Sequence, residues 1–274
     1  MKFNMVTTLK EDSKLLRIDT EDGIDNCMGS IPNYNELKKQ IDLNKWYYTD
    51  KKIPYVHNEY GYRCDTIDSI YENDYILTFG CSYSYGEGLF YEDVYATKLA
   101  KKLDLKNINL AIPGSGISPQ VYNTILFNNN FNKIRLPKYV IYQYPNDYRV
   151  SLSTYEETRN HLDIDTFTAG HIKEYDQNGY IFDYYLENDG EKKLKDLLFP
   201  LYLNNVWETL NVPVFHITFS DYKQEFKSKY QSFEILDIVD GNHDIHERAK
   251  DLSHNGRNFH DKVYKTILKK IKNG

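Results

Sequence analysis

The segment Tyr75-Ile-Leu-Thr-Phe79, followed directly by Gly80-Cys-Ser-Tyr-Ser-Tyr-Gly86, decides the fold. The first five residues form an apolar run of the kind expected for a buried strand, and a helical pattern covers Val94 to Leu103. In open α/β folds the loop between two such elements lies at the carboxyl edge of the sheet, where ligands bind. The segment therefore predicts a glycine-flanked turn that is either a nucleophile turn or an ordinary strand-to-helix connection.

A carboxylate and a histidine lie three residues apart in Asp251-Leu-Ser-His254, directly before a helical pattern that begins near Phe259. Asp251 can accept a hydrogen bond from one imidazole nitrogen, which leaves the other nitrogen as a general base toward a serine hydroxyl such as that of Ser82. The same spacing is compatible with a structural histidine that is bonded to Asp251 without catalysis.

Two further segments provide groups that stabilise an oxyanion. Asn109-Leu-Ala-Ile-Pro-Gly114-Ser-Gly116 reads as a short strand followed by glycines that allow backbone N–H groups to face a ligand. The strand-like run Tyr139 to Tyr144 ends in Pro145-Asn146-Asp147, which places a side-chain amide at the same edge of the sheet. A tight turn at the glycines and an Asx turn at Asn146 are the alternatives.

From about residue 72 to its end the chain resembles the SGNH (GDSL-like) hydrolase family, whose four sequence blocks appear in order. Gly80-Cys81-Ser82 stands where the family has Gly-Asp-Ser, and Gly114 falls in the glycine block. Asn146-Asp147 fits the Gly-x-Asn-Asp block, and Asp251-x-x-His254 fits the final Asp-x-x-His. The stretch Phe79 to Leu89, together with the abundance of Lys, Asn, Ile and Tyr, looks similar to SGNH-like proteins of bacteriophages and marine bacteria.

The resemblance implies roles for five residues. Ser82 is the nucleophile, His254 is the base, and Asp251 orients His254. The backbone N–H groups of Ser82 and Gly114, with the Asn146 side chain, form the oxyanion hole. The family needs no cofactor for this chemistry.

The activity implied is that of a serine esterase or O-deacylase that forms an acyl-enzyme, with an acetylated carbohydrate as the first candidate substrate. An O-acyltransferase uses the same triad. Two departures favour a third possibility, a non-catalytic binding or virion structural protein: Cys81 replaces the usual aspartate, and Tyr144 occupies a glycine position. A general α/β-hydrolase elbow fits less well because Ser84 stands where its second glycine belongs.

Strand-like runs alternate with helical patterns and predict a parallel sheet covered by helices. With the resemblance, this gives a three-layer α/β/α sandwich of the flavodoxin-like type. The expected strands are Tyr75 to Phe79, Asn107 to Ala111, Tyr139 to Tyr144, Val212 to Phe219 and a weaker Phe233 to Val239.

The expected organisation is an N-terminal extension over residues 1–71, packed on a hydrolase-like domain over 72–274. An insertion at about 151–188 follows the Asn146 block and is placed to shape or cover the site. A helix is expected from about Tyr34 to Leu43, and Asn58 and Arg63 are read as residues that pack the extension onto the domain.

The histidine-rich C-terminal segment also allows a metal site, because imidazole and carboxylate groups are ligands for zinc and iron. No HExxH motif is present, so the sequence favours the triad. The candidate ligands are His243, His246, His254, His260, Asp240, Asp244 and Asp251.

Composition narrows the possible partners. The net charge of −6 over 274 residues, with dispersed lysines, argues against nucleic-acid binding. Cys27, Cys64 and Cys81 match neither a disulfide framework nor a zinc motif, which suggests a reducing compartment. No apolar run is long enough for a signal peptide or a membrane span, so we expect a cytoplasmic protein, or one released by lysis if a phage encodes it. No feature predicts the oligomeric state.

Overall fold

A computed structural model describes most of the chain from residue 34 onward. The described residues are 34–49, 51–58, 60–128, 134–145, 149–156, 161–168, 189–219, 233–238 and 244–274. Asn146, Asp147, Asp240 and His243, which the sequence singled out, lie outside these ranges.

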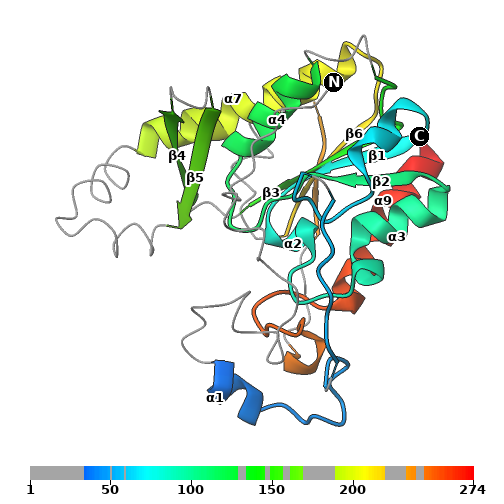
Figure 1. The fold of residues 1–274 in the computed structure, drawn as a ribbon, viewed down its shortest axis with the longest axis vertical. Helices are drawn as coiled ribbons and strands as arrows, with labels where there is room; N and C mark the ends of the chain where they lie inside the picture. Colours follow the sequence, from blue (N-terminus) through cyan, green and yellow to red (C-terminus); the bar gives the residue numbers. More distant parts are fainter. Residues whose placement is uncertain are drawn as a thin grey trace.

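The centre of the molecule is a five-stranded sheet in which every pair of neighbours is parallel (Figure 1). The strand order is β2-β1-β3-β6-β7. This is the doubly wound order of flavodoxin-like folds, and the predicted fold class is confirmed. The strands are β1 Tyr75–Phe79, β2 Lys106–Asn109, β3 Tyr139–Tyr144, β6 Val214–Thr218 and β7 Ile235–Asp237.

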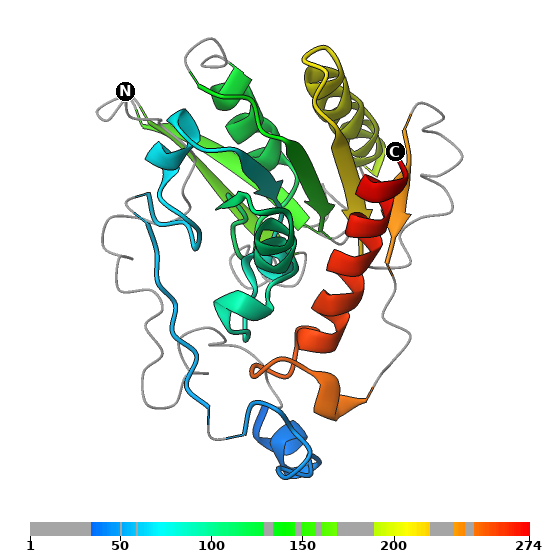
Figure 2. The same cartoon turned by 90° about the vertical axis from the view of Figure 1, so that its right-hand side faces the viewer.

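Helices cover both faces of this sheet, because successive side chains of the buried strands point to opposite sides. In β1, Ile76 packs into the apolar cluster shared with α3 (Tyr95–Leu103) and α9 (Arg257–Asn273). Its neighbour Leu77 packs into the cluster that contains residues of α4 (Ser118–Asn128) and α7 (Asp189–Glu208). Figure 2 shows α9 lying along the sheet beside β7.

The chain reverses its direction of strand addition at β1. From β1 it adds β2 on one side of the sheet, and then crosses to add β3 on the other. Loops that leave neighbouring strands at such a switch point diverge and leave room for a ligand. The residues that follow β1 therefore lie at the position where this fold places its sites.

β1 and β3 have the predicted boundaries, whereas other elements are shorter than predicted. β2 ends at Asn109 because the Asn109 side chain accepts the N–H of Ala111 and donates to Ser84 O, which turns the chain. α1 ends at Lys39, not near Leu43, and the Asp42 carboxylate accepts the Asn44 N–H in the turn that follows. Side-chain capping of this kind competes with regular structure at its ends.

Two strands lie outside the main sheet. β4 (Arg149–Glu156) and β5 (His161–Thr168) pair antiparallel with each other, in the stretch expected to interrupt the strand and helix alternation. β4 begins two residues before the predicted insertion at about 151–188, and β5 lies within that range.

The described part of the predicted N-terminal extension contributes to the apolar core. Trp46, Tyr48, Ile53 and Tyr55 belong to the same buried cluster as α3 and α9. Residues 34–63 run past the loop that precedes α9, and α1 lies beside that loop in Figure 2. Three short 3₁₀ helices complete the described elements: η2 Ile67–Tyr71, η3 Tyr91–Asp93 and η6 Ile245–Glu247.

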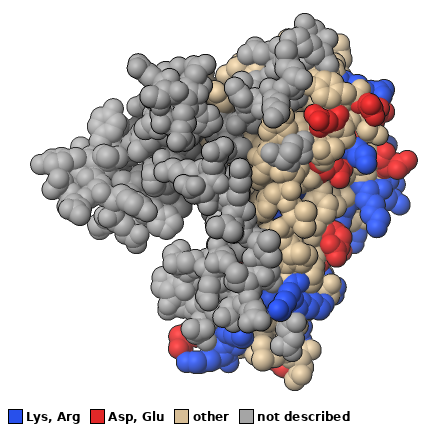
Figure 3. All heavy atoms as spheres, in the orientation of Figure 1, with Lys and Arg blue, Asp and Glu red and all other residues tan. Residues whose placement is uncertain are grey.

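Within the described ranges, no helix has both the length and the apolar composition that crossing a bilayer requires. On the face seen in Figure 3, acidic and basic side chains of the described residues are interspersed along the exposed edge. They form no continuous basic surface on that face.

Candidate active site

The turn after β1 is shaped by close packing around Gly80. A Cβ atom at this position would lie 2.4 Å from Ser84 Oγ and 2.9 Å from Gln143 Oε1, so a side chain cannot be accommodated without a shift. The extended residue Cys81 then donates its N–H to Gln143 Oε1 at 3.0 Å. The short helix α2 (Ser82–Tyr85) starts immediately afterwards, which places Ser82 at the carboxyl edge of the sheet.

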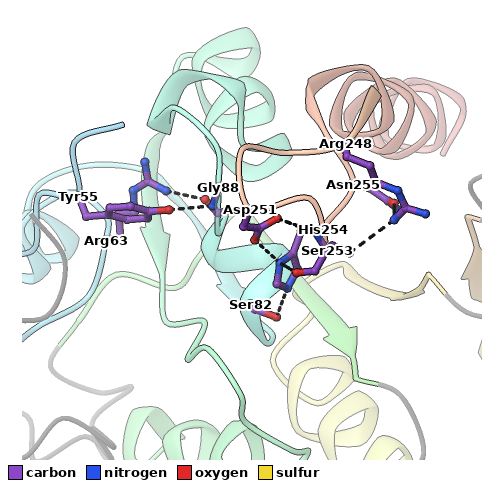
Figure 4. Close-up of polar contacts among 10 residues, drawn as sticks. Tyr55, Arg63, Ser82, Gly88, Arg248, Asp251, Ser253, His254 and Asn255 are labelled. Carbon is purple, nitrogen blue, oxygen red and sulfur yellow. Dashed lines mark hydrogen bonds and ion pairs between the residues drawn. The ribbon is translucent and has the colours of Figure 1, made fainter. Parts of the chain in front are cut away.

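Three residues predicted from the sequence meet in a chain of hydrogen bonds (Figure 4). Ser82 Oγ lies 2.7 Å from His254 Nε2, and His254 Nδ1 lies 2.5 Å from Asp251 Oδ2. The other carboxylate oxygen, Asp251 Oδ1, accepts the backbone N–H groups of Ser253 and His254, each at 3.0 Å. These bonds fix the carboxylate, and the carboxylate in turn fixes the plane of the imidazole.

The site is shielded from water. Ser82 is 3% exposed and Asp251 is 2% exposed, while the His254 side chain is 14% exposed. The Tyr83 ring meets the His254 ring edge to face, with centroids 4.8 Å apart. Low exposure strengthens the electrostatic coupling between the carboxylate and the imidazole.

The pKa of His254 is set by opposing effects. Burial, the largest single effect, lowers it, whereas the Asp251 carboxylate raises it through its charge and its hydrogen bond. Glu87 and Cys81 act in the same direction as Asp251, and the net result of all these effects is a pKa of about 9. The site thus favours the imidazolium form, which is the state that a base reaches after it has accepted a proton.

The second predicted loop lies beside the nucleophile turn. Ile112 N–H and Ser115 Oγ both donate to Gly80 O, at 3.0 and 3.2 Å, and so attach the loop after β2 to the turn after β1. Between them, Gly114 has φ of +76° and a Cβ built on it would meet no atom within 4 Å. Ser82 is the first residue of α2, where a backbone N–H has no partner in its own helix.

Cys81 and Tyr144, the two residues that depart from the family pattern, make their side-chain contacts away from the reacting groups. Cys81 is buried, and its Sγ lies 3.0 Å from Gln143 Oε1 beneath the turn. Tyr144 is also buried, and its hydroxyl lies 2.6 Å from His216 Nδ1. Burial lowers the pKa of His216 to about 3, so this histidine is neutral and accepts or donates without charge.

Sequence reasoning missed the role of Gln143, whose Oε1 lies within bonding distance of Cys81 N, Cys81 Sγ and Ser84 Oγ. It holds the nucleophile turn onto β3. The signal was present, because an amide within the buried strand Tyr139–Tyr144 has to find partners. Tyr83 and Glu87, which also surround His254, carried no such signal.

The described histidines of the C-terminal segment, His246, His254 and His260, bond to separate partners. His246 bonds to Asp244 through Nδ1 at 2.7 Å, and its Nε2 accepts the Asp42 N–H. His260 is buried on α9, accepts the Tyr95 N–H through Nδ1, and has its pKa lowered by burial to about 3. Among the described residues, no three His, Cys, Asp or Glu side chains are grouped as metal ligands.

No protein-family model and no curated protein matches the chain. Among solved structures it is similar to a carbohydrate esterase, with 11% identity, a TM-score of 0.46, and coverage of 73% of this chain and 65% of the other. It is also similar to an acetyl xylan esterase from the rumen bacterium Butyrivibrio proteoclasticus, with 13% identity, a TM-score of 0.43, and coverage of 74% and 64%.

A third similar structure is a protein from Desulfitobacterium hafniense DCB-2 that is suggested to be lipolytic and of the G-D-S-L family, with 13% identity and a TM-score of 0.36. The match covers 70% of this chain and 97% of that one. The chain spans less than two thirds of the length of the two esterases. The likeness concerns the course of the backbone, and the chemistry of this chain depends on its own side chains.

Proposed function

We propose that the protein is a serine hydrolase that cleaves ester bonds through an acyl-enzyme on Ser82. The observation that supports this most directly is the continuous hydrogen-bonded chain from Asp251 through His254 to the Ser82 hydroxyl. A structural Asp–His pair needs only the first of these bonds. The second bond directs the free imidazole nitrogen to a hydroxyl on a strand-to-helix turn, which is how a nucleophile is activated.

In the proposed reaction, Ser82 Oγ attacks the ester carbonyl carbon while His254 Nε2 accepts the hydroxyl proton. The negative charge that develops on the carbonyl oxygen is stabilised by the N–H groups of Ser82 and Gly114, joined by the Asn146 amide as the sequence resemblance implies. The carbonyl–alkoxy bond then breaks, and the departing alcohol takes the proton from His254. Water hydrolyses the acyl-Ser82 ester with His254 again as base, which releases the acid and restores the hydroxyl.

The substrate class we propose, an O-acetylated carbohydrate, follows from the resemblance of the four sequence blocks. Purified protein should release acetate from such a substrate and from 4-nitrophenyl acetate. A partition of the acyl group toward added alcohol instead of water would identify an O-acyltransferase.

Labelling with a fluorophosphonate tests the nucleophile. We expect one covalent adduct per chain, located on Ser82 by fragmentation of the labelled peptide. Ser84→Ala is the matched control, because Ser84 lies on the same short helix but its hydroxyl contacts Tyr95 and Gln143. This variant should keep the label. An adduct at another serine, or a folded protein without any adduct, would exclude Ser82 as the nucleophile.

The pH dependence of kcat/KM follows from the pKa of His254. The base has to be neutral in the free enzyme, and its pKa is raised to about 9. We therefore expect kcat/KM for 4-nitrophenyl acetate to rise by about tenfold per pH unit below that value and to level off above it. Initial rates across this range, with spontaneous hydrolysis subtracted, measure the profile. A flat profile between pH 6.5 and about 9 would show that the pKa of the base is not raised, and would contradict the strong coupling of His254 to Asp251.

A further inference from the structure

The segment that carries Asp251 and His254 contains neither a helix nor a strand of the main sheet. It is a loop closed by the bridge between Arg248 and Asn255 and by the bond from Ala249 N–H to His254 O. Its position relative to Ser82 therefore depends on what it packs against.

One of the groups that this loop packs against is the backbone of Gly88. Gly88 lies two residues after Gly86, the glycine that follows the nucleophile turn. Gly88 O accepts the Lys250 N–H at 3.0 Å. A Cβ built on Gly88, which has φ of +73°, would lie 3.0 Å from Asp251 Cγ and 2.9 Å from Ala249 Cβ. The Gly88 backbone thus approaches Asp251 so closely that a side chain would not fit between them.

Two side chains from the N-terminal extension hold this part of the loop. Tyr55 Oη accepts the Gly88 N–H at 2.7 Å. Arg63 donates to Gly86 O through one terminal nitrogen and to Leu89 O through the other, each at 2.7 Å. The guanidinium carbon lies 4.3 Å from the centre of the Tyr55 ring. Figure 4 shows Tyr55 and Arg63 on one side of Gly88, with Asp251 and His254 on the other.

Both side chains are almost completely buried, with Tyr55 4% and Arg63 2% exposed. Burying a guanidinium is unfavourable unless its N–H groups are satisfied, and an apolar side chain would fill the same space without that penalty. What an apolar side chain cannot do is bridge two backbone carbonyls with a planar, two-pronged donor. The chemistry of Arg63 is therefore matched to fixing a loop, which goes beyond the packing role read from the sequence.

We propose that Tyr55 and Arg63 are positioning residues that hold residues 86–89 against Asp251 and so set its alignment with His254 and Ser82. Their effect on turnover rests on the proposed hydrolase function. Neither residue touches the reacting atoms, and both come from a segment that precedes the nucleophile in the sequence.

The variant Tyr55→Phe tests this proposal because it removes one hydroxyl and keeps the ring beneath Arg63. Tyr48→Phe is the matched control. Tyr48 is a buried tyrosine of the same extension, its ring packs on Phe90, and the polar groups that act on its hydroxyl are Asp93, Tyr47 and Arg257, none of which lies in the segment 86–89. Both variants delete a buried hydroxyl, but only Tyr55→Phe releases Gly88.

We expect Tyr55→Phe to lower kcat about tenfold with KM unchanged, since small displacements of a catalytic group have large effects on rate. The apparent pKa of the base should also fall, because a misaligned Asp251 raises the pKa of His254 less. The other groups that act on His254 are Glu87 and Cys81, and His260 lies close enough to sense its charge. Cys81 and His260 lie outside the segment 86–89, whereas Glu87 lies within it, so a displaced Glu87 would lower the His254 pKa in the same direction as a displaced Asp251. Tyr48→Phe should leave kcat and the pKa at wild-type values.

The His254 pKa is to be read from the pH titration of its ring nitrogens by NMR, which requires no turnover. If the wild type fails to react with a fluorophosphonate, the hydrolase proposal fails, and the titration still decides the positioning role. The proposal would be overturned if Tyr55→Phe kept the wild-type His254 pKa and the wild-type kcat. It would also be overturned if Tyr55→Phe and Tyr48→Phe changed these two quantities equally. Arg63→Lys, which cannot bridge both carbonyls, should shift the titration in the same direction where it folds.

Discussion

Replacing Ser82 by alanine is expected to lower kcat on 4-nitrophenyl acetate by about 10⁴-fold or more. The variant lacks the oxygen that forms the acyl-enzyme, and the remaining groups can only orient water against the ester. Its free energy of unfolding should change by no more than about 1 kcal/mol, because one hydrogen bond to His254 is lost and no apolar contact is removed. Steady-state kinetics and thermal unfolding measure the two quantities.

The activity that remains in Ser82→Ala determines whether Ser82 can be assigned as the nucleophile. Complete reaction of the wild type with a fluorophosphonate beforehand should reduce its activity to that of Ser82→Ala, which controls for a contaminating esterase. A folded Ser82→Ala protein that keeps more than about a tenth of kcat would place the nucleophile elsewhere, because the groups that remain after loss of a nucleophile supply only a small fraction of the wild-type rate.

The sheet and the pairing of Asp251 with His254 could be predicted because their signals are local. β1 is a continuous apolar run that ends at a glycine, and the Asp251 to His254 spacing places a carboxylate within reach of its own histidine. Both patterns depend only on residues that are neighbours in the sequence. The structure adds the long-range step, the 2.7 Å contact between His254 and Ser82 across 172 positions.

The sequence could not show contacts that are made by side chains whose residue type suggests a different role. The sequence indicates that Arg63 packs the extension onto the domain, but it does not show that the guanidinium bonds to carbonyls 23 and 26 positions away. The early end of β2 depends on Asn109, whose amide bonds to Ser84 O in another element. Such effects depend on the assembled fold and leave no periodic pattern.

Asp251→Asn is expected to lower kcat by about 10⁴-fold while leaving the backbone of the loop in place. The asparagine oxygen can still accept the N–H groups of Ser253 and His254. Its amide nitrogen, however, then faces His254 Nδ1 and stabilises the tautomer that carries its proton on Nε2. In that tautomer the imidazole cannot accept the proton of Ser82.

Asp244→Asn is the matched control, because Asp244 forms a similar Asp–His pair with His246 away from Ser82, through a 2.7 Å bond and a backbone N–H. This variant should change kcat little. If both variants reduce kcat to the same extent, the effect of Asp251→Asn reflects a general disturbance of the C-terminal segment and not the orientation of the base.

The same substitution should alter the pH dependence of stability in a direction fixed by the His254 pKa. Since folding raises that pKa from 6.5 to about 9, protonated His254 stabilises the fold fully below pH 6.5, and this contribution is lost as pH rises through about 9. Asp251→Asn removes the largest favourable partner of the imidazolium. The difference in Tm between wild type and variant should therefore be greatest below pH 6.5 and decrease toward pH 9. A difference that grows over this range would show that Asp251 does not stabilise the charged imidazole, and would contradict its role beside a catalytic base.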